Sequence, residues 1–111
     1  MRKPRRLSDE AAAVLSLFVR DPDRPLYGRE VIRRTSVRSG SLYPILHRFE
    51  QHQLLRAEWE TIGDAVEAGV RPRRYYTLHP EGAERARIAL AEWNANHQGH
   101  RPAAKVRPAT S

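Results

Sequence analysis

The stretch that decides the fold is Gly40-Ser41-Leu42-Tyr43-Pro44-Ile45-Leu46-His47-Arg48-Phe49-Glu50. Its apolar residues recur every three or four positions, at Leu42, Ile45, Leu46 and Phe49. This spacing places the four side chains on one face of an α-helix, where they are buried together. We therefore expect a helix from Ser41 to Gln53.

Two further helices are predicted upstream of this stretch. Ser8 is followed by two acids and then by apolar residues up to Arg20, which is the pattern of an N-cap and a first helix. Residues 21–25 contain two prolines and predict a turn. From Leu26 to Thr35 helical spacing returns, and a short break over residues 36–40 then leads into the third helix.

Downstream, residues 54–61 and 73–78 are rich in strand-forming residues and predict a β-hairpin. The connection over residues 62–72 is longer than a tight turn and contains glycine and proline, as expected of a flexible wing. Pro80 opens a last helix, since proline is tolerated at the first helical position. In that helix a coiled-coil seam with alternating spacings of three and four is formed by Ala83, Ala86, Leu90, Trp93 and His97.

The order helix, helix, short turn, helix, hairpin, helix is typical of a winged helix-turn-helix, whose third helix enters the major groove of DNA. The expected fold class is mainly α with a two-stranded β wing, and with dimerisation helices at both ends. We divide the chain into a basic N-terminal arm (1–7), the winged helix-turn-helix domain (8–79), a C-terminal dimerisation helix (80–98) and a disordered basic tail (99–111).

The formal net charge of +7 is concentrated at the two ends of the chain. Residues 1–6 and 99–111 carry seven basic residues and no acid, whereas the residues between them are balanced in charge. Such tails favour an anionic partner whose phosphates they track. The absence of cysteine excludes disulfides and thiolate metal sites, and the longest apolar stretch is far shorter than a membrane span. We expect a cytoplasmic protein that needs no cofactor and does not bind membranes.

A helix that enters a DNA groove presents arginines and small polar groups at its N-terminal end. Arg38, Ser39 and Ser41 meet this requirement. Gly40 allows the backbone to approach a phosphate, and Arg48 lies two turns further along, where it would reach the flanking strand.

The second helix carries three arginines with two different interpretations. Arg29 and Arg33 share one face just before the third helix, so phosphate contact and a solvated surface are both consistent with their spacing. Arg34 lies four residues after Glu30, which is the separation of an ordinary surface ion pair on a helix.

The chain resembles the PadR-like transcriptional regulators over roughly residues 7–93, and three motifs carry this resemblance. Leu26-Tyr27-Gly28-Arg29-Glu30-Val31 resembles the Tyr-Gly second helix of that family, and the stretch over residues 40–50 is similar to its Gly-Thr-Leu-Tyr-Pro recognition helix. The third motif, similar to the second wing strand and the Thr-Pro-Glu-Gly start of the last helix, is Arg71-Pro72-Arg73-Arg74-Tyr75-Tyr76-Thr77-Leu78-His79-Pro80-Glu81-Gly82.

This resemblance implies a homodimer joined through its first and last helices, acting as a repressor on an inverted repeat in double-stranded DNA. It implies that Tyr43 serves the DNA backbone and that the wing arginines approach phosphates or the minor groove. The residues expected at the DNA are Arg29, Arg33, Arg38, Ser39, Gly40, Ser41, Tyr43, Pro44, Arg48, Arg71, Arg73 and Arg74. Those expected at the dimer interface are Leu15, Phe18, Ala86, Leu90, Trp93 and His97.

The chain departs from the family pattern at three positions. Ser41 replaces the usual threonine, and Gln53 replaces the glycine that often ends the recognition helix. His79 stands where a threonine usually caps the last helix, and histidine is a poorer cap.

Alternative functions have less support in the sequence. His47 and His52 are five residues apart, which does not bring both onto one helix face, and the absence of a nucleophile–base pattern argues against catalysis. Trp59 and Trp93 are interpreted as packing residues, with a pocket for a small-molecule effector as the alternative.

A winged-helix protein-interaction module without specific DNA binding would be expected to carry acids on the face from Arg38 to Arg48, where the sequence has none. An RNA-binding accessory protein would be expected to show exposed aromatics on its strands for base stacking, and Tyr75 is the only candidate.

Overall fold

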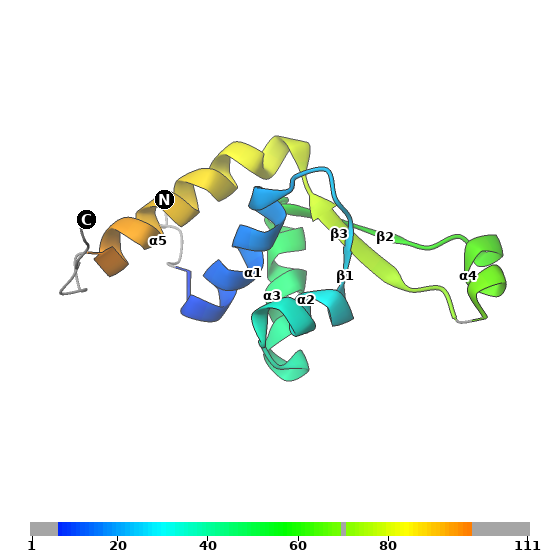
Figure 1. The fold of residues 1–111 in the computed structure, drawn as a ribbon. Coiled ribbons are helices and arrows are strands. Elements are labelled where there is room, and N and C mark those ends of the chain that lie inside the picture. Colours follow the sequence, from blue (N-terminus) through cyan, green and yellow to red (C-terminus); the bar gives the residue numbers. More distant parts are fainter. Residues whose placement is uncertain (1–6, 70, 99–111) are drawn as a thin grey trace, which may run out of the picture.

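The computed structural model describes residues 7–69 and 71–98, which form five α-helices and three short strands. In chain order the elements are α1 (Asp9–Arg20), β1 (Leu26–Tyr27), α2 (Gly28–Thr35), α3 (Ser39–Gln51), β2 (Leu55–Trp59), α4 (Ile62–Ala68), β3 (Arg74–Leu78), the 3-10 turn η1 (Pro80–Gly82) and α5 (Ala83–Gln98). Helices α1, α2 and α3 gather on one side, the β2–β3 hairpin projects away from them with α4 at its end, and α5 runs alongside α1 (Figure 1). This is the predicted winged helix-turn-helix architecture.

Helix α1 begins as its sequence predicts. The Ser8 hydroxyl accepts a hydrogen bond from the backbone N–H of Ala11 at 3.0 Å, which satisfies a donor left open at the helix start. Asp9 and Glu10 in the first turn complement the positive end of the helix dipole. The helix therefore has a defined start, and its apolar face is buried in the core.

The core lies between α1, α2, α3 and the sheet, and the predicted stripe of α3 is buried in it. Leu15 and Phe18 of α1 and Ala86 of α5 are also 0% exposed within the single chain. These three side chains pack into the core of their own chain, and their contribution to a dimer interface stays a prediction.

The sheet has one strand more than predicted. Leu26 and Tyr27 form β1 instead of the first turn of α2, and they pair antiparallel with Tyr76 and Tyr75 of β3. The resulting strand order is β1-β3-β2. The helical expectation from Leu26 onward was wrong for these two residues because β3 has a free edge, and pairing there buries Leu26 to 2% exposure.

Helix α3 begins and ends two residues earlier than predicted, at Ser39 and Gln51. The N–H of Gln53 donates to the Glu50 carbonyl at 3.0 Å, and the N–H of Leu54 donates to the Phe49 carbonyl at 2.8 Å. These two bonds form a Schellman motif, in which Gln53 takes the left-handed position with φ of 61°. The glycine that the family often has here is thus replaced by a residue in the same conformation.

The connection over residues 62–72 is not the bare loop that we expected, since it contains α4. Gly69, with φ of 72°, follows the helix in a conformation that favours glycine. The wing is therefore a hairpin with a helical end.

Helix α5 begins at a capped turn that rests on the end of α3. Nδ1 of His79 accepts from the backbone N–H of Glu81 at 3.1 Å, so His79 serves as the cap in place of the usual threonine. A Cβ added to Gly82 would collide with the carbonyl oxygen of Gln53 and lie 2.9 Å from the Cα of Leu54. Only glycine lets η1 pack this closely against the backbone that ends α3.

This contact predicts that Gly82→Ala lowers the free energy of unfolding by about 1–3 kcal/mol, the usual cost of overpacking. The backbone on both sides would have to separate, because no flexible side chain is available to yield. Urea unfolding followed by circular dichroism measures the loss. Gly63→Ala is the matched control, because an added Cβ there meets nothing within 4 Å. Equal stability of the two variants would contradict the tight packing at Gly82.

Candidate nucleic-acid interface

The N-terminal end of α3 is exposed and carries the residues predicted to meet DNA. Arg38 precedes the helix with an extended backbone, and its side chain makes no capping hydrogen bond. Ser39 and Gly40 are exposed, and Ser41 is half-buried. Pro44 lacks an N–H, so it leaves the carbonyl of Gly40 without its helical donor. The first turn of α3 thus offers a guanidinium, hydroxyls and backbone groups on one short surface.

Tyr43 of α3 packs against the first residue of α2. A Cβ added to Gly28 would lie 2.5 Å from Oη and 2.8 Å from Cε1 of Tyr43. The Tyr43 side chain nevertheless remains 45% exposed. Two sequence motifs that lie fifteen residues apart, at Tyr27-Gly28 and Leu42-Tyr43-Pro44, are therefore parts of one contact.

Five of the predicted arginines are exposed and form no ion pair within residues 7–69 and 71–98: Arg29, Arg33, Arg38, Arg48 and Arg71. Four of them belong to α2, to α3 or to the residue that precedes α3. By contrast, Arg34 lies 4.0 Å from Glu30, as expected from their spacing. The unpaired guanidinium groups leave the helix-turn-helix with cations available to an anionic ligand.

The other two wing arginines are held by carboxylates of the same chain. Nη2 of Arg74 lies 2.7 Å from Oε2 of Glu50 on α3, and its guanidinium lies 5.7 Å from the ring of Trp59. Nη2 of Arg73 lies 3.0 Å from Oε2 of Glu60. Arg73 and Arg74 therefore differ from Arg71, although the sequence alone placed all three in the same role.

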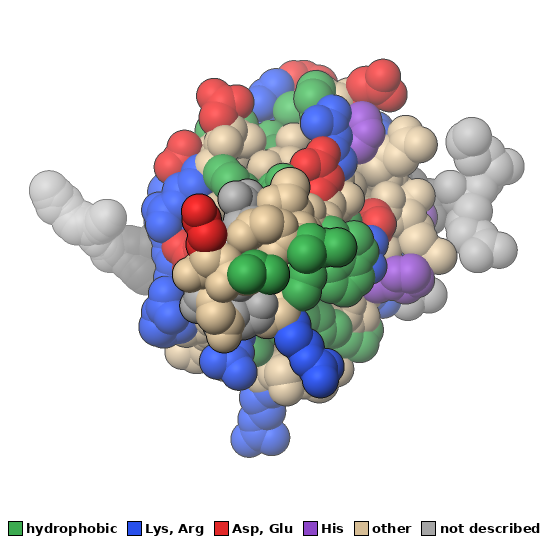
Figure 2. Space-filling model, turned by 90° about the vertical axis from the view of Figure 1, so that its right-hand side faces the viewer, with side chains coloured by type: hydrophobic (Ala, Val, Ile, Leu, Met, Phe, Trp, Pro, Cys, Tyr) green, Lys and Arg blue, Asp and Glu red, His purple; other side chains and the backbone are tan. Residues whose placement is uncertain are grey.

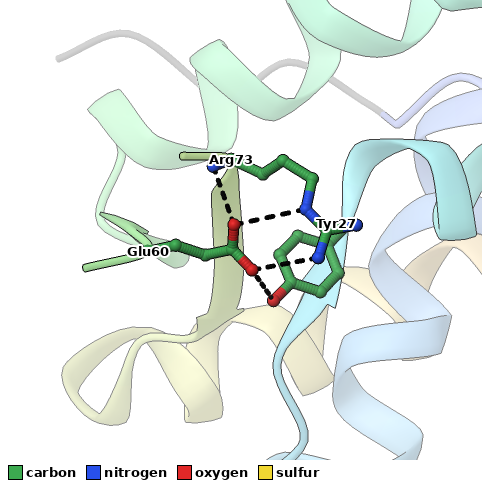
Figure 3. Close-up of polar contacts among 3 residues, drawn as sticks. All are labelled: Tyr27, Glu60 and Arg73. Carbon is green, nitrogen blue, oxygen red and sulfur yellow. Dashed lines mark hydrogen bonds and ion pairs between the residues drawn. The ribbon is translucent and has the colours of Figure 1, made fainter. Parts of the chain in front are cut away.

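Glu60 is the residue directly after β2, and it is the centre of a cluster with Tyr27 and Arg73 (Figure 3). The Tyr27 hydroxyl donates to Oε2 of Glu60 at 2.7 Å. The backbone N–H and Nε of Arg73 donate to Oε1 at 3.0 and 3.3 Å. The Arg73 guanidinium also lies 4.2 Å from the centre of the Tyr27 ring. We call these three residues the Glu60 cluster.

The Glu60 cluster was missed at the level of sequence because its members are 33 and 13 residues from Glu60 along the chain. No local spacing links them, and the only signal was the unexplained acid at the end of a predicted strand. The hydrogen bonds from Arg73 and then from Tyr27 lower the pKa of Glu60 from 4.5 to about 2. The same pairing raises the pKa of Arg73. Glu60 is therefore ionised in any buffer near neutrality.

The end of the wing carries an exposed apolar surface. Trp59, Ile62 and Val66 are 63%, 73% and 69% exposed. Figure 2 looks onto this end of the molecule, where hydrophobic side chains gather on the surface. Glu58 and Glu67 are exposed on the same hairpin and its helix. Arg71, which lies between α4 and β3 at this end of the wing, is exposed as well, and its contact with phosphates stays a prediction.

A groove of about 450 Å³ runs between α1 and α5. It is lined by Leu90, Trp93 and His97, the three predicted dimer residues that are not fully buried, and by Asp9 and small residues of α1. Nε2 of His97 lies 2.9 Å from Oδ1 of Asp9, and the His97 ring stacks on Trp93 at 3.9 Å. Nε1 of Trp93 is buried without a hydrogen-bond partner in the part of the chain that the structure describes. This groove is the one place where the predicted dimer residues meet at the surface.

Residues 15–88 match the sequence profile of the family described as the transcriptional regulator PadR-like family. The chain belongs to the PadR-like family. Because this match includes α2, α3, the wing and the start of α5, it covers the elements whose geometry is described above. Among curated protein sequences none matches this chain.

Solved structures with the same fold agree with this membership. A PadR family transcription regulator from Clostridium difficile is 20% identical, with a TM-score of 0.64 over 82% of this chain and 93% of that one. A PadR-like transcription factor from Bacteroides fragilis is 24% identical, with a TM-score of 0.61 over 80% and 84%. Pex from Synechococcus is 26% identical, with a TM-score of 0.60 over 85% and 86%. In the described residues, moreover, none of the helices has the length and apolar character that a membrane crossing requires.

The packing of Tyr43 on Gly28 predicts that Gly28→Ala destabilises the chain by displacing the tyrosine ring. In a double-mutant cycle with Tyr43→Ala, the cost of Gly28→Ala should fall by about 0.5–3 kcal/mol, the range found for residues in contact. Thermal or urea unfolding of the four proteins gives this coupling. Gly40→Ala is the control for added bulk, since a Cβ there meets nothing within 4 Å. Additive effects of the two changes would rule out the contact.

The pKa of Glu60 predicts how stability depends on pH. Its folded value of about 2 lies below the 4.5 of a free glutamate, so the cluster stabilises the fold above about pH 4.5 and loses this effect as pH falls toward about 2. Glu60→Gln should therefore flatten the decline of unfolding free energy across that interval. Urea unfolding at a series of pH values measures it, and Tyr27→Phe should give an intermediate slope. An unchanged slope in Glu60→Gln would contradict the low pKa.

Proposed function

We propose that this chain is a DNA-binding transcriptional regulator that places α3 in the major groove of a specific operator. The observation that carries this proposal is the group of unpaired, exposed arginines around the start of α3, together with Tyr43, in a member of the PadR-like family. Small polar groups at the helix start and an arginine two turns further along suit base edges and phosphates respectively. The exposed Arg71, between α4 and β3 at the far end of the wing, suits the flanking backbone or minor groove.

The proposed active form is a homodimer that reads an inverted repeat. The groove between α1 and α5 supports this form, because it leaves Trp93 and Leu90 only half-buried in one chain. A two-fold dimer through this region would present two copies of α3 to successive major grooves, about 34–36 Å apart. Binding at such a site within a promoter would block polymerase, so we propose a repressor.

A second candidate function is a winged-helix interaction module, and the apolar end of the wing favours it. Three large hydrophobic side chains exposed on one hairpin and its helix are typical of a surface that meets another protein. This alternative does not explain why the helix-turn-helix keeps its exposed arginines unpaired.

The experiment that separates the two functions is a fluorescence-anisotropy titration with two labelled duplexes, the chain's own promoter region and a scrambled sequence, at two salt concentrations. A specific regulator binds the native duplex about 10³-fold tighter, or more, at moderate salt. Equal binding that collapses as salt is raised would contradict the proposed function, because only non-specific charge attraction behaves in that way.

The proposed interface predicts that Arg38→Ala and Arg48→Ala each weaken binding to the native duplex by about 1–3 kcal/mol, which is about thirtyfold at the middle of that range. Both side chains are exposed, so the melting temperature should hardly change. Arg20→Ala, in the last turn of α1, removes the same charge and should have a much smaller effect. If all three variants lose affinity equally, net charge alone governs binding and α3 is not the recognition helix.

A further inference from the structure

The wing arginines divide into two classes that the proposed function does not distinguish. Arg71 is exposed and has no carboxylate partner among the described residues, whereas Arg73, two positions later, is held by Glu60. A guanidinium that reads a phosphate must offer its N–H groups to solvent.

The carboxylate of Glu60 engages two of the five side-chain N–H groups of Arg73, whose side chain is 50% exposed. Nε and Nη2 of Arg73 both point to Glu60, at 3.3 and 3.0 Å, in the two-point geometry that guanidinium and carboxylate groups prefer. The face of the guanidinium lies against the Tyr27 ring. The Glu60 side chain is itself only 11% exposed and accepts a further bond from Tyr27. A phosphate could take over these two donors only by leaving a half-buried carboxylate beside a second anion.

The Glu60 cluster also connects the wing to the recognition helix. Arg73 precedes β3 and Glu60 follows β2, so the cluster joins the two strands where their pairing ends on the side of α4. Tyr27 belongs to β1, and the Tyr43 ring of α3 packs against the next residue, Gly28. The direction of the wing relative to α3 is thus set through Tyr27.

We propose that Glu60 is a positioning residue for DNA recognition. It holds the Arg73 side chain between the wing and the start of α2, and it keeps the positive charge of Arg73 away from phosphates. This proposal rests on the proposed DNA-binding function. Its consequence is specificity, because non-specific affinity rises with every phosphate that a protein neutralises. Because Glu60 neutralises the charge of Arg73, the wing can orient on the duplex without adding sequence-independent attraction to phosphates.

The test measures how affinity for the scrambled and native duplexes depends on salt. Each phosphate contact contributes about 0.9 to the slope of log K against log salt, per chain. Arg71→Gln should make the slope shallower by about that amount, whereas the matched change Arg73→Gln should leave it unaltered. Glu60→Gln should make the slope steeper by about 0.9 per chain and reduce the preference for the native duplex, because it releases Arg73. The double variant Glu60→Gln/Arg73→Gln should return to the slope of the unaltered protein.

These outcomes separate the proposal from a purely structural role and from failure of the proposed function. If Arg73→Gln reduces the slope as much as Arg71→Gln, Arg73 contacts a phosphate and the proposal is overturned. If Glu60→Gln only lowers stability, the slope stays the same and the proposal is again overturned; titrations well below the melting temperature of each variant keep the readings comparable. If the unaltered protein binds both duplexes equally, specific regulation fails, while the slopes of the variants still decide whether Glu60 withholds Arg73.

Discussion

Strand β3 is hydrogen-bonded on both edges, and the arrangement of the whole molecule depends on this pairing. On one edge it meets β1, which leads directly into α2; on the other it meets β2, which follows α3. The central strand therefore connects the two helices of the helix-turn-helix through backbone bonds rather than through side chains alone. Tyr76 and Leu78 of this strand are buried in the same core as α1. The wing is in this sense an extension of the core and not an appendage.

Two ion pairs then fix arginine side chains that the sheet has brought close to carboxylates. Glu50 and Glu60, one from α3 and one beyond β2, hold the two adjacent arginines at the start of β3. A half-buried ion pair of this kind is more valuable for geometry than for stability, since desolvation offsets much of the attraction. The exposed arginines of α2 and α3 have no such partners in the described chain. Charge is thus paired where the chain needs a defined direction and left unpaired where a ligand is expected.

Much of this architecture follows from sequence because its signals are local. The cap at Ser8, the apolar stripe of α3 and the strand formers of the hairpin each act within a few residues, and the structure confirms all three. Strand β1 could not be predicted in the same way, because Leu26 and Tyr27 become a strand only when β3 lies beside them. The Glu60 cluster was invisible for the same reason. The burial of Leu15, Phe18 and Ala86 also depends on how α5 returns to α1, which no periodicity reveals.

The junction between α3 and α5 has a consequence for how the chain tolerates change in length. The N–H of His79 donates to the Leu54 carbonyl at 2.9 Å, Nη1 of Arg85 donates to the His52 carbonyl at 3.0 Å, and Gly82 lies against the backbone of Gln53. The start of α5 is therefore fixed, and one residue inserted just after Gly82 would turn the rest of the helix by about 100°. Leu90 and Trp93 would then leave the groove beside α1. Insertions and deletions should consequently be excluded from this short segment during evolution, while the connection that contains α4 remains free to vary in length.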